Sequence, residues 1–281
     1  QAYARYGVPV TLVDSNPRIL ARDHARNSAL VQAALERDGV IVRTGVRAVR
    51  VDPAAGDEGA HRIALSDGST ADGHAVLLSI GRAIPFEGLG LDTIGVAAED
   101  RMPRPDEQLR IAPHVYVVGD PAGPELHTHL AHYQGEMAVR IARGEKVQPD
   151  YRAIPRALYT EPEAASVGLL LEQALEAGYD AFEATADLAT TAKGYTAEAE
   201  GHVTIVVDRA TRTLLGAFIG GPGASELIHE AVLAVKLRIP LADLADTIHA
   251  FPTAARVMGN LFVQVPRELE GVARPAQNVQ R

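Results

Sequence analysis

Two short apolar runs, each stopped by glycine and a charged residue, most limit what this chain can fold into. Residues 75–80 (AVLLSI) stop at Gly81-Arg82, and residues 115–118 (VYVV) stop at Gly119-Asp120. Runs of this length and apolarity are typical of strands that are buried on both faces of a sheet. A polar group directly after such a strand lies at the carboxyl edge of a parallel sheet, where these sheets bind ligands. We therefore expect a nucleotide-binding α/β layer.

The surrounding pattern predicts an alternation of helix and strand, with antiparallel pieces inserted. The predicted strands lie over 8–14, 40–46, 49–52 and 62–65, and the predicted helices over 16–38 and 130–144. Beyond a linker over 145–155 the order changes to α+β. Helices are predicted over 169–177, 224–237, 241–248 and from 253, and strands over 203–208 and 214–219. A domain boundary near Asp150 follows, and we expect the tail from Pro266 to be mobile.

Composition excludes several partners and chemistries. The 281 residues hold 27 Lys and Arg against 36 Asp and Glu, a formal charge of −9, without the basic cluster that nucleic acid or an anionic membrane demands. The sequence has no cysteine, so disulfides, thiolate metal sites and cysteine nucleophiles within it are excluded. No apolar run approaches the roughly 18 residues of a membrane span, and the first residues lack a signal-peptide pattern. We expect a cytoplasmic protein without a membrane span.

The first residues resemble the end of a helix. Residues 1–7 (QAYARYG) close at glycine and lead into the β-rich run over 8–14. A helix this short is marginal in water on its own. We therefore expect the sequence to be the C-terminal fragment of a longer chain.

Two aspartates follow predicted strands and are candidate ligand-binding residues. Asp120 is placed to accept a hydrogen bond from a sugar hydroxyl, and Asp14 from the ribose hydroxyls of an adenosine. The alternative for each is a helix N-cap or turn aspartate. The glycine-rich phosphate loop that accompanies such an acid in a dinucleotide fold is absent from the sequence.

Histidines and glycines offer two further candidates, and both have simpler interpretations. Residues 127–132 (HTHLAH) place imidazoles close together, but no Asp or Glu at a helical offset completes a metal site, so we expect no metal. Residues 220–223 (GGPG) precede a predicted helix without the Lys-Ser/Thr of a phosphate loop, which favours a tight strand-to-helix turn.

Several motifs in succession resemble the flavin-dependent pyridine nucleotide–disulfide oxidoreductases, the family that includes dihydrolipoamide dehydrogenase, mercuric reductase and soluble transhydrogenase. The motifs are 6–14 (YGVPVTLVD), 79–85 (SIGRAIP), 106–110 (DEQLR), 115–120 (VYVVGD), Pro155, 159–168 (YTEPEAASVG), 214–216 (LLG), 221–222 (GP) and 226–228 (ELI). The resemblance spans nearly the whole chain. It implies partial Rossmann-like NAD- and FAD-binding domains, over 1–100 and 101–150, followed by an α+β dimerisation domain over 151–281.

The resemblance implies FAD as a cofactor. By this resemblance, Asp120 is expected to bind the ribityl chain of FAD. The residues that lie against the flavin, mainly through backbone groups, are Leu126, His127, Thr128 and His129. The following helix then points its N-terminus at the electron-rich end of the ring system, which explains the histidine-rich loop without metal.

The resemblance also implies NAD(P) as a cofactor. Asp14, Val46 and Gly81 match positions that line the NAD site in the family. An acid at Asp14 favours NAD over NADP because its charge repels a 2′-phosphate, although Arg18 nearby weakens that preference.

One departure from the family affects the expected chemistry. The disulfide reductases carry H-x-H-P-T-x-x-E, whose second histidine and final glutamate form a proton-transfer pair. Residues 249–256 read HAFPTAAR, so Phe251 replaces the base and Arg256 replaces the acid. Phenylalanine has no titratable proton, so we assign no catalytic residue within this chain. His249 is expected to be a core or interface histidine.

The leading functional hypothesis is a homodimeric flavoprotein that passes hydride from NAD(P)H to FAD and electrons to a small-molecule acceptor, with a quinone or another nicotinamide favoured over dihydrolipoamide. The alternatives are a divergent disulfide or metal-ion reductase whose cysteines lie upstream, or a noncatalytic fragment that only dimerises. The dimer is expected because two predicted helices carry more apolar residues than a small domain buries alone, at Leu227, Ile228, Ala231, Val232, Val235, Val257, Met258, Leu261 and Phe262.

Overall fold

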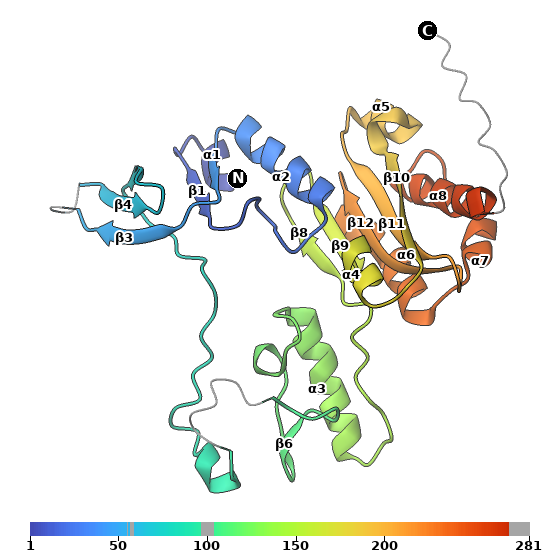
Figure 1. Cartoon of the computed structure of the whole chain (residues 1–281), viewed down its shortest axis with the longest axis horizontal. Helices are drawn as coiled ribbons and strands as arrows, with labels where there is room; N and C mark the ends of the chain where they lie inside the picture. Colours follow the sequence, from blue (N-terminus) through green and yellow to red (C-terminus); the bar gives the residue numbers. More distant parts are fainter. Residues whose placement is uncertain (55, 57–58, 97–103, 270–281) are drawn as a thin grey trace. The chain divides into compact units, whose positions relative to one another are not determined.

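The computed structural model describes residues 1–281 except 55, 57–58, 97–103 and 270–281 (Figure 1). The chain forms two compact units, one of residues 1–76 and 152–281 and the other of residues 77–151. The domain limits expected at residues 100 and 150 remain predictions. Among the described residues no helix is long and apolar enough to span a bilayer.

The first unit begins with a parallel β–α–β layer. β1 (Thr11–Asp14) pairs with β2 (Ile41–Thr44) in parallel, and α2 (Ala25–Arg37) connects them. A short helix, α1 (Ala2–Arg5), precedes β1. An antiparallel meander follows, made of β3 (Ala48–Asp52), β4 (His61–Leu65) and β5 (Thr70–Gly73). This is the expected alternation with antiparallel pieces inserted, although β5 was not predicted.

The helix predicted over 16–38 begins only at Ala25, which corrects that boundary. The Arg18 guanidinium donates to the backbone oxygens of Leu20, Ala21 and Asp23, at 2.8, 3.0 and 2.7 Å, and holds the preceding residues in turns. The Nδ1 atom of His24 accepts from the backbone nitrogen of Arg26 at 3.2 Å and caps the true helix start.

A five-stranded antiparallel sheet forms the rest of the first unit, in the order β10-β11-β12-β9-β8. Its strands are β8 (Arg156–Leu158), β9 (Ala164–Gly168), β10 (Ala181–Asp187), β11 (His202–Asp208) and β12 (Thr213–Gly220). The helices between and after them are α4 (Leu171–Glu176), α5 (Ala192–Ala197), α6 (Ala224–Leu237), α7 (Leu241–Asp246) and α8 (Ala254–Leu269). The predicted glycine turn over 220–223 is confirmed, because β12 ends at Gly220 and α6 begins at Ala224.

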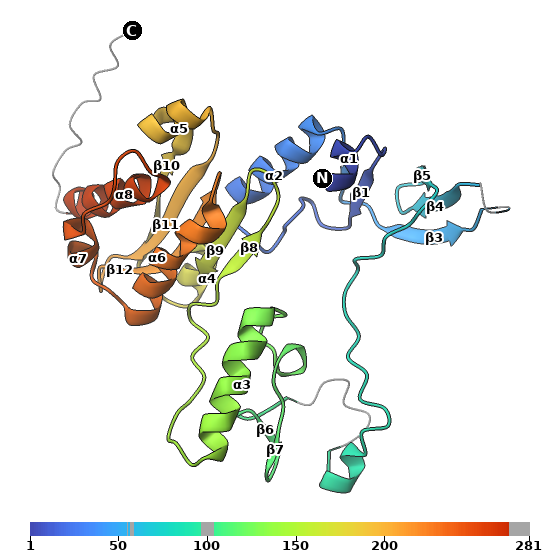
Figure 2. The ribbon, with the colours of Figure 1, turned by 180° about the vertical axis from the view of Figure 1, so that it is seen from behind.

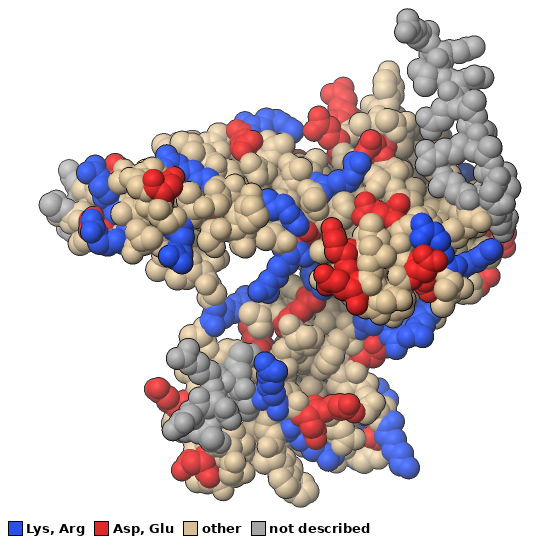
Figure 3. All heavy atoms as spheres, viewed as in Figure 1, with Lys and Arg blue, Asp and Glu red and all other residues tan. Residues whose placement is uncertain are grey.

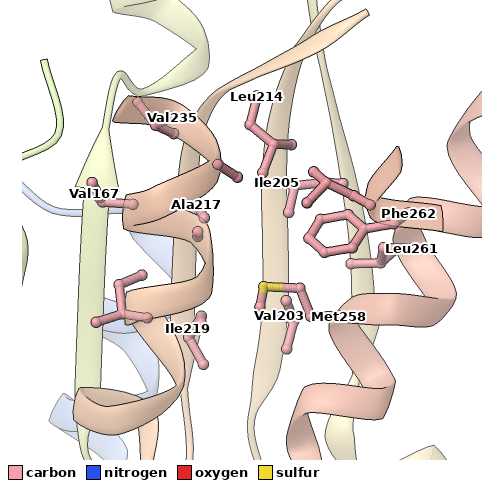
Figure 4. Close-up of a cluster of buried hydrophobic side chains, with 14 of the residues drawn as sticks. Val167, Val203, Ile205, Leu214, Ala217, Ile219, Val235, Met258, Leu261 and Phe262 are labelled. Atoms are coloured by element: carbon pink, nitrogen blue, oxygen red, sulfur yellow. The ribbon is translucent and has the colours of Figure 1, made fainter. Parts of the chain in front are cut away.

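The two faces of this sheet pack against different helices. Val203, Ile205 and Val207 alternate along β11 toward α6, α7 and α8 (Figure 4). The opposite face carries Val206 and Phe218 toward α4, and α2 packs on the same face. Figure 2 shows the helices from behind.

The structure corrects the argument that was used to predict the dimer. The apolar residues of α6 and α8 are largely buried within one chain: Ile228 is 1% exposed, Val257 3% and Phe262 0%. The sheet supplies the surface that covers them. The exposed apolar residues of α6 are Leu233 and Leu237.

The second unit contains β6 (Arg110–Ala112), β7 (Val115–Tyr116) and α3 (Thr128–Ala142), with short 3-10 turns η1 (Leu91–Ile94) and η2 (Asp120–Ala122). Two strand predictions are corrected here. Residues 75–80 are extended but pair with no strand in the described chain, and Leu77 and Ile80 are 87% and 89% exposed. The run over 115–118 forms only the two-residue β7, which is half-buried and antiparallel to β6. An apolar run becomes a buried strand only where neighbours cover it.

Two further predictions have mixed outcomes. Pro266 lies inside α8 rather than in a mobile tail, and the rest of the predicted tail, 270–281, lies outside the described residues. On the face drawn in Figure 3, basic and acidic side chains are interspersed over the described residues rather than gathered by sign.

Candidate cofactor site

The Gly119-Asp120 turn of the second unit is held against α3 by one buried side chain. Gly119 has φ 77° and ψ −151°, a conformation that is essentially restricted to glycine, and a Cβ there would lie 3.3 Å from the Cβ of Ala131. Gln134 is fully buried on α3. Its Oε1 accepts from the Gly119 nitrogen at 2.7 Å, and its Nε2 donates to the Gly123 oxygen at 2.6 Å. The turn is therefore fixed on both sides.

Arg82 joins three of the predicted site residues. It follows Gly81 in sequence, and its Nη1 donates to the Asp120 carboxylate at 2.8 Å and to the backbone oxygen of Leu126 at 3.4 Å. Asp120 begins η2, and its carboxylate pairs with this guanidinium. The carboxylate is 35% exposed, so it has room to accept further hydrogen bonds.

The histidine-rich loop leads into α3. His127 is the N-cap residue, and its Nε2 lies 2.9 Å from Oε2 of Glu125. The His127 and His129 rings stack with centroids 4.9 Å apart, and Thr128 is the first residue of the helix. Among the described residues no group of three or more His, Asp or Glu side chains is arranged to hold a metal ion. The helix N-terminus that follows favours negative charge.

Replacing Gln134 by Leu should destabilise the second unit. The substitution leaves the Gly119 N–H and the Gly123 C=O without their buried partner, at a cost of about 1–3 kcal/mol for each group. Urea unfolding followed by tyrosine near-UV dichroism measures the change, because Tyr133 on α3 and Tyr151, whose hydroxyl accepts from Gln134, have ring centroids 6.4 Å apart. His132→Leu, at an exposed position of α3, is the control and should change stability little. Equal stability of the two variants would contradict the role of Gln134.

Asp14 and Val46 lie in the other unit, at adjacent strand ends. The Val46 nitrogen donates to the Asp14 backbone oxygen at 3.2 Å. The Asp14 carboxylate accepts from the backbone nitrogen and Nδ2 of Asn16, both at 2.8 Å, as the turn alternative predicted. Arg18, which was expected to weaken a preference for NAD, instead binds the three backbone oxygens of the following turn.

The segment that departs from the family motif lies on the sheet unit. Phe251 is 73% exposed, and Arg256 is exposed at the start of α8. The side chain of His249 is only 5% exposed, as expected of a core histidine. Its Nε2 lies 2.7 Å from Glu230 Oε1 and its Nδ1 3.0 Å from the Thr247 oxygen, so neither nitrogen is free to act as a base.

Sequence reasoning missed two residues of this site. Arg82 was visible as the charged residue after an apolar run, but only the structure joins it to Asp120, 38 positions away. Gln134 gave no signal, because a glutamine on a helix is ordinarily a surface residue.

These features define the class of protein: a parallel β–α–β layer together with an α+β sheet unit. Two family models match, the pyridine nucleotide-disulphide oxidoreductase model over residues 1–135 and the dimerisation domain of the same family over residues 154–261. The chain belongs to the pyridine nucleotide-disulphide oxidoreductase family. The fold class expected from the sequence is thereby confirmed.

Curated relatives and solved structures agree with this assignment. The dihydrolipoyl dehydrogenase of Thermus scotoductus is 37% identical over 260 residues, which are 90% of this chain and 56% of that protein. The dihydrolipoyl dehydrogenase of Chlorobaculum tepidum is 34% identical over 91% of this chain and 55% of that protein. The LpdA structure from Mycobacterium tuberculosis has a TM-score of 0.85 and 29% identity, covering 94% of this chain and 58% of that chain. The chain thus spans little more than half the length of these relatives.

Proposed function

We propose that these residues form part of a homodimeric FAD-dependent oxidoreductase that takes hydride from NAD(P)H and passes electrons to a small-molecule acceptor. The proposed parts are an NAD-binding remainder over 1–100, the C-terminal part of an FAD-binding domain over 101–150, and a dimerisation domain over 151–281. The observation that carries the proposal is the Gly119-Asp120 turn, which Gln134 in the middle of α3 fixes.

The side chains of the second unit suit a flavin cofactor. The Asp120 carboxylate is an acceptor for ribityl hydroxyls, and the glycine before it allows close approach of the backbone. Residues 126–129 would lie against the ring system, where the start of α3 favours negative charge. Arg82 would orient the Asp120 carboxylate. When bound, FAD supplies the hydride-accepting and electron-donating chemistry.

NADH should be preferred to NADPH, and Asp14→Ala should narrow the preference. The carboxylate at the end of β1 is placed to accept ribose hydroxyls and to repel a 2′-phosphate. We expect this to favour NADH over NADPH by roughly 1–3 kcal/mol. The measurement is kcat/KM for both nucleotides in the gene product that contains this chain. Asp72→Ala is the control, because Asp72 is an exposed carboxylate paired with Arg62 on the β4–β5 hairpin. A higher kcat/KM for NADPH than for NADH in the unmutated protein would show that a cation elsewhere determines the nucleotide preference.

The acceptor is proposed to be a quinone or a second nicotinamide. Phe251 and Arg256 replace the histidine and glutamate that transfer protons in the thiol chemistry of the family. His249 does not substitute for them, because its Nε2 is hydrogen-bonded to Glu230. A disulfide or metal-ion reductase with cysteines outside these residues is the second candidate, supported by the dihydrolipoyl dehydrogenase relatives.

Flavin content and NADH oxidation test the proposal. The gene product that contains this chain should purify with one FAD per subunit and should oxidise NADH with a naphthoquinone as acceptor. These 281 residues alone should retain less flavin, because half the contacts do not offset the cost of association. A gene product without flavin or NADH oxidation would favour the noncatalytic alternative.

The dimer is proposed to form through the sheet unit, as the matched dimerisation model suggests. Leu233 and Leu237 lie one turn apart on α6 and are 55% and 63% exposed, and Ile248 on the loop after α7 is 95% exposed. Sedimentation equilibrium should find a two-fold dimer at micromolar concentration, which Leu233→Asp weakens because it places a charge in an apolar contact. Detection of monomer alone would exclude this proposal.

A further inference from the structure

A buried polar cluster lies where α2 packs against the sheet of the first unit. Figures 1 and 2 show α2 beside β9 of that sheet. Asn27 on α2 is fully buried, His202 at the start of β11 is 4% exposed, and the side chain of His24 is 11% exposed. Gly220 permits the close approach, because a Cβ there would lie 2.5 Å from Leu30 Cδ2. An apolar cluster completes the contact and contains Ile19, Val31, Leu35, Val40 and Ala164.

Hydrogen bonds assign the state of the His202 ring. The Nδ2 of Asn27 donates to Asp23 Oδ1 at 3.1 Å and to the Ala165 oxygen at 3.3 Å, so its Oδ1 is the acceptor for His202. The His202 Nε2 therefore donates to that oxygen at 3.0 Å. Its Nδ1 accepts from the hydroxyl of Thr204 at 2.9 Å. The ring is neutral, with its proton on Nε2.

The charged groups around the ring oppose a second proton. His24 lies beside it, with ring centroids 5.8 Å apart, and Arg26 is a nearby cation. The pKa of His202 is lowered from 6.5 to about 3. Burial is the largest cause, and His24 and Arg26 lower the pKa further.

The nearby carboxylates have other partners. Glu183 on β10 lies 3.0 Å from the His24 Nε2, Asp187 on β10 pairs with Arg26 at 3.2 Å, and Asp23 accepts from Asn27. The side chains that β9 and β12 bring to the cluster are uncharged. Within the described part of the chain, no carboxylate therefore contacts the His202 ring to stabilise a positive charge on it.

We propose that His24, Asn27 and His202 form an acid-sensitive joint, which docks residues 1–46 on the sheet while the His202 ring is neutral and releases them when it is protonated. The docked layer carries Asp14 and Val46. If the proposed nucleotide site is correct, the joint also positions that site relative to the sheet. The joint itself does not depend on any bound cofactor.

The direction of the pH effect follows from proton binding. The released state, with an ordinary histidine pKa of 6.5, binds more protons than the docked state between about pH 3 and 6.5. Docking is therefore strongest above that range and weakens by up to about tenfold for each pH unit within it. Between about pH 7 and pH 5 the docking equilibrium should fall about 30-fold.

Hydrogen exchange of the chain measures the release. After correction for intrinsic exchange rates, protection of amides in α2 and β2 should fall about 30-fold between about pH 7 and pH 5, while amides in β11 and β12 stay protected. His202→Gln should remove this dependence. Asn27→Leu should lower α2 protection at both pH values. His229→Gln, at an exposed position on α6, should behave like the unmutated chain.

Three experimental results would contradict the proposed joint. They are pH-independent protection of α2 in the unmutated chain, a parallel loss in β11 that indicates global unfolding, and a dependence abolished by His24→Gln but kept in His202→Gln. Because the exchange experiment uses no flavin or nucleotide, its result stands apart from the test of the proposed enzyme activity.

Discussion

Phe251→His combined with Arg256→Glu should raise dihydrolipoamide or disulfide turnover in the gene product that contains this chain, if that product carries redox cysteines. Positioned acid–base groups contribute about 10²–10⁴ in rate, and the two substitutions restore both members of the family's pair. In the unmutated protein Phe251 has no proton to transfer, and Arg256 offers no carboxylate to orient a base. Quinone reduction should change by only a few-fold, because it requires no proton transfer at sulfur.

Both positions suit this experiment because their side chains are exposed, so neither substitution opens a cavity. Ala250→His is the matched control: it adds an imidazole at an exposed position of the same loop without an acid partner. Turnover with dihydrolipoamide and with a naphthoquinone is measured for each variant. Efficient dihydrolipoamide oxidation by the unmutated protein would refute the argument and would mean that a residue outside this chain supplies the proton.

Phe262→Ala should lower the free energy of unfolding by about 3–5 kcal/mol, the usual cost of removing a buried aromatic ring. Phe262 is fully buried on α8 and belongs to the main core with Ile205 of β11 (Figure 4). Its ring also lies near His249, with centroids 6.2 Å apart, so the loop that carries Phe251 should loosen as well.

Urea unfolding followed by far-UV dichroism measures this loss. Leu233→Ala is the control on α6: its side chain is 55% exposed, so its removal should change the stability of the isolated subunit by no more than about 0.5 kcal/mol. If the two variants lost the same stability at concentrations where the protein is monomeric, the assignment of α8 to the core of one subunit would be wrong.

The sequence by itself determined the family, the change from α/β to α+β order near residue 150 and most limits of the predicted helices in the second half. The helix predicted over 224–237 has the bounds of α6, because an apolar stripe with glycine before it is a local signal. The Asp120 turn and the start of α3 were placed for the same reason. The replacements at Phe251 and Arg256 were visible because a motif fixes their spacing.

Only the tertiary structure decided which surfaces cover the apolar residues and which distant polar groups meet. Residues 75–80 are as apolar as a buried strand yet lie exposed, whereas the stripe on α8 that was expected at a subunit interface is buried by the chain's own sheet. An apolar side chain is more stable when buried, but the sequence does not show which surface covers it. The Asn27–His202 contact joins residues 175 positions apart. Such a pairing depends on how α2 docks on β11, which no local pattern encodes.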